Sequence, residues 1–171
     1  MAAWSVERDN GKMTTAPAVP PPVVALAAVV GQRLLSRNSS TPSLPRRVAS
    51  LTLLGTALSL AGSAAGRFRS AGTTVDPHHP ERSTALVTNG VYRLTRNPIY
   101  LGLAVALLAH AVHRGSPLAL VPVAGYLVWI DRLQIPAEES ALAVTFGTEW
   151  DAYCASVPRW LSLPQIIRET H

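Results

Sequence analysis

The sequence predicts an all-α, multi-pass integral membrane protein, a helical bundle of about four transmembrane segments with an amphipathic C-terminal helix. Two observations predict this fold. Hydrophobic residues make up 48% of the 171 residues and charged residues only 15%, whereas soluble domains carry about 25% charged residues. The apolar residues are also gathered into four runs. We therefore expect membrane lipids to surround most of the chain.

Residues 1–19 precede the first apolar run and mix charged residues with small polar ones. They lack the apolar stretch of a secretion signal, and we interpret them as a disordered tail. Residues 20–171 are expected to form one membrane domain, because this length fits a single domain. Cys154 is the only cysteine of the sequence, which excludes a disulfide within the chain.

The first two apolar runs differ in how well they fit a membrane span. Residues 20–35 form a short run, and Gln32 and Arg33 are expected to extend toward the membrane interface; whether this run spans is left open. Residues 48–66 form nineteen residues without a charge, within the range of about 17–25 residues that crosses a bilayer. Their many Gly and Ala residues indicate either close packing against another helix or simply an Ala-rich helix.

The third and fourth runs, residues 98–112 and 115–130, are each marginal in length for a span. The alternative is a soluble bundle whose core helices are buried. The tight link Gly115-Ser116-Pro117 between two nearly uncharged runs favours a membrane hairpin over that alternative.

The placement of positive charge predicts a topology. If the N-terminus is inside and four segments cross, ten of the fifteen Lys and Arg residues lie on the cytoplasmic side, as the positive-inside bias requires. Residues 67–97 and 131–171 then share the cytoplasmic face, so they can build one site together. The net charge of +5 fits a membrane surface, and with these apolar runs we expect no nucleic-acid partner.

The loop between the second and third runs holds two features of interest. Asn89-Gly90 predicts either a strand-like hairpin or a short interfacial helix. His78 and His79 lie near acidic residues, but adjacent histidines point in different directions and no third ligand has the spacing of a known site. We therefore expect no metal.

The segment after the fourth run combines acids with aromatic residues. Pro136 is expected in the first turn of a helix, with Glu138 and Glu139 near its N-terminus, where the helix dipole favours acids. Phe146, Trp150 and Tyr153 are spaced to lie on one amphipathic face at the membrane surface.

Three ordered stretches together point to a family. They are "GVYRLTRNPIYLG" at residues 90–102, "EESALAVTFGTEWDAY" at residues 138–153 and "VPRWL" at residues 157–161. Taken singly, an arginine or a tyrosine at a membrane border is an interfacial anchor. As an ordered set, over residues 67–161, they resemble the isoprenylcysteine carboxyl methyltransferase family and the related phospholipid methyltransferases, in a bacterial-type member.

The resemblance implies S-adenosylmethionine as methyl donor, bound at the cytoplasmic face. It implies that Glu138 holds the amino group or ribose of this cofactor. It also implies that the rest of the cofactor site comes from the border of the third run, namely Arg96, Asn97, Pro98, Ile99 and Tyr100.

The same resemblance implies a lipidic or small amphipathic methyl acceptor, most like the carboxyl group of a prenylated cysteine. Arg132 is the nearest candidate for contacting that carboxylate, although Gln134 occupies the better-aligned position. Glu139 is expected to support the cofactor site. A thiol acceptor would need a base, for which Tyr92 or Glu139 would have to serve.

Other functions remain open from the sequence. A small thiol or a phospholipid amine could be the acceptor. A related class of membrane reductases uses a similar Arg-Asn-Pro-x-Tyr segment to bind a nicotinamide cofactor, and a non-enzymatic membrane scaffold would carry the same interfacial arginines.

Overall fold

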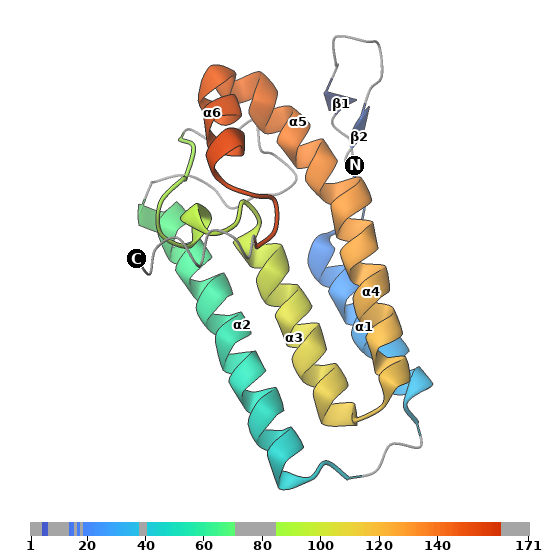
Figure 1. Cartoon of the computed structure of the whole chain (residues 1–171). Helices are drawn as coiled ribbons and strands as arrows, with labels where there is room; N and C mark the ends of the chain where they lie inside the picture. The colour runs from blue at the N-terminus through green and yellow to red at the C-terminus, as the bar shows by residue number, and fades with distance from the viewer. Residues whose placement is uncertain are drawn as a thin grey trace.

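The computed structural model describes residues 5–6, 14–15, 17, 19–37, 41–70 and 85–161. Four helices lie side by side along one direction (Figure 1). They are α1 (Pro21–Leu35), α2 (Leu44–Ser70), α3 (Pro98–Arg114) and α4 (Leu120–Trp129), with a short 3-10 helix, η3 (Pro117–Ala119), leading into α4. Helix α3 is central, because it contacts each of the other three. The expected helical bundle is therefore present.

The remaining elements gather at one end of this bundle (Figure 1). They are the 3-10 helix η2 (Gly90–Arg93), α5 (Ile135–Phe146), α6 (Thr148–Ser156) and an antiparallel pair of two-residue strands, β1 (Ser5–Val6) and β2 (Thr14–Thr15). After Asn89-Gly90 the chain thus forms a short helix and not a hairpin. Most of the tail of residues 1–19 lies outside the described residues, so its expected disorder stays a prediction.

Small residues bring α2 and α3 together. Ala57 and Ala64 on α2 are buried. A Cβ atom added to Gly102 of α3 would lie 3.1 Å from the backbone oxygen of Ala57, so a larger residue here would push the two helix backbones apart by a few tenths of an ångström. Close packing therefore explains part of the Ala-rich composition, whereas Gly55 and Gly62 face open space among the described residues.

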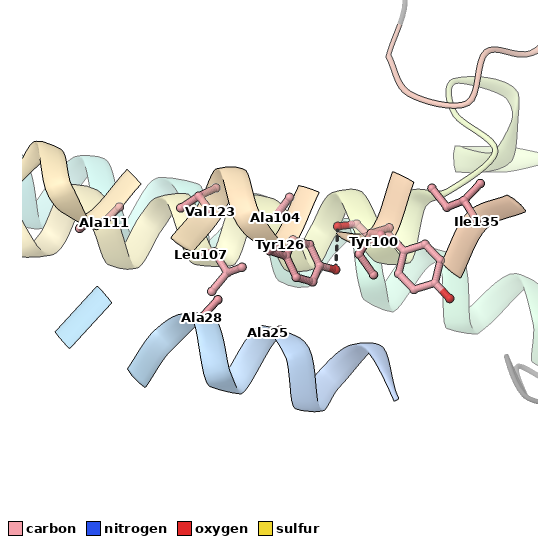
Figure 2. Packing of buried hydrophobic residues seen from close by; sticks show 11 residues of the cluster. Ala25, Ala28, Tyr100, Ala104, Leu107, Ala111, Val123, Tyr126 and Ile135 are labelled. Carbon is pink, nitrogen blue, oxygen red and sulfur yellow. Dashed lines mark hydrogen bonds between the residues drawn. The ribbon is translucent and has the colours of Figure 1, made fainter. Parts of the chain in front are cut away.

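The main hydrophobic core lies between α1, α3 and α4 (Figure 2). Ala25 and Ala28 of α1, Ala104 and Leu107 of α3 and Tyr126 of α4 all belong to this cluster. The Tyr126 hydroxyl donates to the backbone oxygen of Tyr100 at 3.5 Å. Burial of these side chains fixes which face of α3 turns toward α4.

Two helical stretches are long and apolar enough to cross a bilayer, Leu44–Arg67 and the continuous helix Pro117–Phe146. Leu51 and Leu58 of α2 are each 66% exposed, which suits a helix that faces lipid rather than a buried core helix. Helix α1 has 15 residues and is therefore about 22 Å long, shorter than the ~30 Å hydrocarbon core. These helices agree with membrane association.

Pro136 lies in the first turn of α5 (Ile135–Phe146), as expected, but this helix has no free N-terminus. The backbone stays helical from α4 through a π-helical turn, η4 (Ile130–Gln134), into α5. Proline has no N–H to donate to the preceding turn, and a wider π turn is a known way to absorb such a break. Glu138 and Glu139 therefore lie inside a long helix, so a free helix N-terminus does not explain them.

Gln32 also differs from expectation, because it points into the bundle instead of extending to the interface. It is fully buried. Its Nε2 donates to the carbonyl oxygens of Leu107 at 2.9 Å and Ala119 at 3.0 Å, and its Oε1 lies 2.8 Å from His110 Nδ1. Gln32 thus ties α1 to α3 and η3 at the end of the bundle away from η2.

The expected amphipathic helix at the C-terminal side is split in two. Gly147, with φ of 51° and ψ of −123°, separates α5 from α6. Trp150 and Tyr153 are buried in a cluster that includes Val157 and the partly buried Phe146. The three aromatic residues do gather on one side, but they pack against the rest of the chain instead of lying free at a membrane surface.

Candidate functional site

The site forms where the segment before α3 meets the segment after α6. The backbone N–H of Arg96 donates to the Pro158 oxygen at 3.0 Å. The Arg159 backbone oxygen accepts hydrogen bonds from Thr95 Oγ1 at 2.9 Å and from Asn97 Nδ2 at 3.1 Å. Residues 85–97 and 147–161 therefore lie at the same end of the bundle, as one shared site requires.

Glu139 is held between two arginines. Arg96 Nη2 donates to Glu139 Oε1 at 3.0 Å. Arg159 donates from Nε to Oε1 at 3.2 Å and from Nη2 to Oε2 at 2.5 Å. The hydrogen bonds to Glu139 raise the pKa of Arg159 above its ordinary value. This carboxylate is fully engaged within the chain, so it acts as an anchor for α5.

The Arg96 side chain points into the interior of the site. Its side chain is only 13% exposed and lies 5.7 Å from the centre of the Trp150 ring. Besides Glu139, it reaches the Cys154 backbone oxygen at 3.4 Å. Among the described residues its Nε has no hydrogen-bond partner and is buried. The expected contact of Arg96 with a cofactor carboxylate therefore competes with Glu139 for the same guanidinium.

Asp131 of the π turn joins the same network. It accepts a hydrogen bond from Trp160 Nε1 at 2.9 Å and one from Arg159 Nη1 at 3.3 Å. We call residues 157–161 the strap. The strap is thus hydrogen-bonded to α5 through Glu139, to η4 through Asp131, and to the start of α3 through Asn97. Its contacts with Asp131 and Glu139 hold the helix η4–α5 just before Gln134 and just after Glu138.

Glu138 faces away from the strap and toward α3. Its Oε1 accepts hydrogen bonds from the Tyr100 hydroxyl and from Gln134 Nε2, the latter at 2.6 Å. Within the described part of the chain, its Oε2 has no hydrogen-bond partner. The two neighbouring glutamates therefore differ in kind: Glu139 is saturated by arginines, while Glu138 is half-buried with one oxygen left for a ligand.

Gln134 lies one helical turn before Glu138 and is fully buried. Its Nε2 is used by Glu138, whereas its Oε1 is a buried acceptor without a partner among the residues described. Gln134 and Glu138 together present two unpaired oxygens. Such a pair is suited to a ligand group that carries N–H or O–H donors or a positive charge.

The other residues that the sequence assigned to the site have different surroundings in the structure. Pro98 and Tyr100 are buried at the start of α3, and Ile99 packs against the cluster formed by Ala64, Val87 and Tyr92.

Burial raises the pKa of Tyr92 well above its ordinary value, which disfavours the ionised form that a base would need. Arg132 is 79% exposed, and its Nε lies 3.5 Å from Asp131 Oδ2. Among the described residues, the structure does not bring it to Glu138.

Sequence reasoning missed Arg159 and Asp131. The stretch "VPRWL" carried a signal for Arg159, because it belongs to the ordered motifs, but its spacing from Glu139 gives no hint of contact. In the described ranges no group of three His, Cys, Asp or Glu side chains gathers as in a metal site. His78 and His79 lie outside those ranges.

Comparison with known proteins agrees with this arrangement. A family model described as phospholipid methyltransferase matches residues 45–149, which include α2, the Arg-Asn-Pro-x-Tyr segment and both glutamates. The chain belongs to the phospholipid methyltransferase family. Membership confirms the family expected from the motifs.

Individual relatives of this chain match smaller parts of it. Proteins of Oryza sativa subsp. indica and subsp. japonica, each named a probable protein-S-isoprenylcysteine O-methyltransferase, are 35% identical over 79 residues, or 46% of this chain. The match spans about two fifths (41%) of each rice protein. An uncharacterized protein of Haemophilus influenzae is 38% identical over 63 residues, which are 37% of this chain and 100% of that protein. No solved structure matches the chain.

Proposed function

We propose that the protein transfers a methyl group from S-adenosylmethionine to a lipidic acceptor. The observation that carries this proposal is Glu138, a half-buried carboxylate with one oxygen fixed by Tyr100 and Gln134 and the other unpaired. A carboxylate held in this way suits the ammonium group or the ribose hydroxyls of the cofactor. Family membership supports the same reaction class.

When bound, S-adenosylmethionine supplies an electrophilic methyl group on a sulfonium sulfur. The residues of the chain bind this cofactor and orient it. Tyr100 and Gln134 fix the Glu138 carboxylate, Asn97 and Pro98 form the start of α3 beside it, and the strap closes the polar side. Alignment of reacting groups can contribute roughly 7–11 kcal/mol to a rate, so a site without a strong base is adequate for this displacement.

The roles of the two glutamates differ in this proposal. Glu138 contacts the cofactor, and Glu139 positions α5 through Arg96 and Arg159. Tyr100 would line the adenosine side through the same contact with Glu138, while Pro98 and Ile99 supply apolar surface. Arg96 could turn from Glu139 toward the cofactor's carboxylate only by giving up a charge-assisted hydrogen bond.

The proposed setting is an integral membrane protein that crosses the bilayer several times, with the site facing the cytoplasm. The acceptor then reaches the site from the bilayer. The names of the rice relatives make the carboxyl group of an isoprenylated cysteine the first candidate acceptor. The family description makes a phospholipid amine the second.

A methyl-transfer assay tests the proposal. The full chain is purified in detergent and incubated with S-adenosylmethionine labelled in its methyl group, together with a prenylated cysteine, phosphatidylethanolamine or a small thiol. We expect label in at least one lipidic acceptor. Binding of NADPH without binding of S-adenosylmethionine would instead place the protein with the membrane reductases, and binding of neither would favour a scaffold.

A further inference from the structure

The end of the bundle opposite the candidate site is strongly basic. The ends of α1 and α3 and the start of α2 lie there (Figure 1). Five arginines on or beside these helix ends form what we call the basic end: Arg33, Arg37, Arg46, Arg47 and Arg114. The acidic residues that the structure describes all lie in η4, α5 and α6. Those carboxylates are thus separated from the basic end by the length of α3, about 25 Å.

Side-chain contacts bring the arginines of the basic end together. Arg114 Nε donates to Ser36 Oγ at 2.8 Å, and Arg114 also donates to the Ser36 backbone oxygen, which ties the end of α3 to the end of α1. The Arg46 guanidinium lies against Gly115, because a Cβ atom added to this glycine would overlap it. The other three arginines are exposed: Arg33, Arg37 and Arg47. The positive charges therefore form one surface and not scattered points.

The helix dipoles explain only some of these charges. Arg33 and Arg114 lie in the last turns of α1 and α3, where the helix dipole favours cations. Arg46 and Arg47 lie instead at the start of α2, whose first turn holds no acidic residue and whose dipole disfavours cations. They donate to the Thr41 and Pro42 backbone oxygens, but neutral carbonyls leave their charge in place. An anion beside this turn would offset that cost.

The surroundings of the basic end indicate the kind of anion. Apolar side chains that are 45–75% exposed lie next to the arginines along the chain: Leu34, Leu35, Leu44, Val48, Leu118 and Leu120. A nucleic acid or a free phosphate would pair with the arginines but would leave these side chains in water. A phospholipid carries both a phosphate and acyl chains, so it matches the two kinds of surface at once.

The lengths of the helices place this surface near the head groups of a bilayer. Helices α1 and α3 have 15 and 17 residues, or about 22 and 25 Å, whereas the hydrocarbon core is about 30 Å thick. Arginines at the ends of such short helices extend toward the lipid phosphates. In the proposed topology these five arginines are outside the cytoplasm, so the positive-inside bias does not account for them.

We propose that the basic end binds the head group of an anionic phospholipid, with the lipid phosphate among the arginines and the acyl chains along exposed side chains such as Leu34 and Leu44. Binding is non-covalent and lies at the opposite end of the bundle from Glu138. The inference therefore goes beyond the proposed function and does not depend on methyl transfer.

The test uses the full chain in dodecyl maltoside and titration calorimetry with three probes. These are dihexanoyl phosphatidylglycerol, dihexanoyl phosphatidylcholine and inorganic phosphate. Arg46→Gln/Arg47→Gln removes two charges from the start of α2. The matched control, Arg67→Gln/Arg69→Gln, removes two exposed arginines from the last turn of the same helix, at the site end. The melting temperature of each variant shows whether it folds.

We expect the wild type to bind phosphatidylglycerol roughly tenfold or more tightly than phosphatidylcholine, whose head group has no net charge. An arginine near anionic lipid strengthens binding about fivefold. Arg46→Gln/Arg47→Gln should therefore weaken phosphatidylglycerol binding roughly ten- to thirtyfold, and the control less than about threefold. Added salt should weaken binding in the wild type, because it screens exposed charges. If the first variant does not fold, Arg33→Gln/Arg37→Gln takes its place, with the same expected loss.

Several results would overturn the inference. Equal affinities of the wild type for the two lipids would show that the charge of the head group is not recognised. Equal losses in the two double variants would reduce the effect to net charge. Unchanged phosphatidylglycerol affinity in Arg46→Gln/Arg47→Gln would place the lipid elsewhere on the chain. Binding of inorganic phosphate as tight as that of phosphatidylglycerol would assign the basic end to a free anion. Failure to bind S-adenosylmethionine would contradict the proposed function and leave this test unaffected.

Discussion

Replacing Arg159 with alanine should loosen the strap and lower stability. The change removes two hydrogen bonds to Glu139, at 2.5 and 3.2 Å, and one to Asp131 at 3.3 Å. A charge-assisted hydrogen bond contributes about 1.5–3 kcal/mol. The Arg159 side chain is 32% exposed, which reduces this contribution, and Arg96 still neutralises Glu139. We therefore expect a loss of about 1.5–2.5 kcal/mol.

Thermal unfolding in detergent measures this change. A loss of that size should lower the melting temperature by roughly 3–10 °C for a chain of this length. Arg132→Ala is the matched control, because this exposed arginine contacts Asp131 only at 3.5 Å, and its effect should stay within about 0.5 kcal/mol. Arg159→Ala should also cost less when Glu139 is already Gln, since the pair then no longer interacts. Equal effects of Arg159→Ala and Arg132→Ala would refute the structural role of the strap.

Two further predictions concern the bundle. Gly102→Leu should destabilise the protein by about 1–3 kcal/mol or more, because its Cβ would lie 3.1 Å from the Ala57 oxygen. Gly62→Leu is the control and should change the melting temperature little, since nothing lies within 4 Å of its Cβ. A larger effect of Gly62→Leu than of Gly102→Leu would contradict the packing of α2 on α3. The exposed leucines of α2 predict that alkaline carbonate leaves the protein in the membrane pellet, and its appearance in the supernatant would contradict membrane insertion.

The parts of the fold that depend on local pattern were predictable. The uncharged run at residues 48–66 lies within α2, Pro98 begins α3 as a proline at the first turn does, and Gly115 ends α3 in the left-handed conformation that glycine favours. Each of these depends on a few neighbouring residues. Apolar runs and helix-end signals can therefore be read without knowledge of the tertiary structure.

The errors arise where distant segments meet. Pro136 lies in the first turn of α5 as predicted, but the π turn before it joins α5 to α4, so the expected free N-terminus is missing. Ile130 and Ile135, at the two ends of that turn, are buried in the core. Gln32 lies near a helix end and resembles an interfacial residue, yet its partners Leu107 and Ala119 are far along the chain. Arg159 lies within the motif "VPRWL", but its pairing with Glu139 depends on how the strap packs against α5, which the motif does not specify.

The motif residues illustrate the same limit. Tyr100 and Glu138 were assigned to one site because their motifs resemble a family, and the structure places the Tyr100 hydroxyl on the Glu138 carboxylate. Arg96 was assigned to the same site by adjacency to Asn97, but its guanidinium turns to Glu139. Sequence motifs indicate which residues gather, while the direction of each side chain depends on packing that no short motif specifies.

The central claim is that Glu138 binds the methyl donor, and titration calorimetry of S-adenosylmethionine into wild-type protein and Glu138→Gln tests it most directly. The substitution keeps the size of the side chain and removes its charge, so one charge-assisted hydrogen bond is lost. We predict measurable binding to wild type and roughly ten- to hundredfold weaker binding to Glu138→Gln. Unchanged affinity in Glu138→Gln, with only a lower melting temperature, would show that Glu138 is structural and would contradict the account.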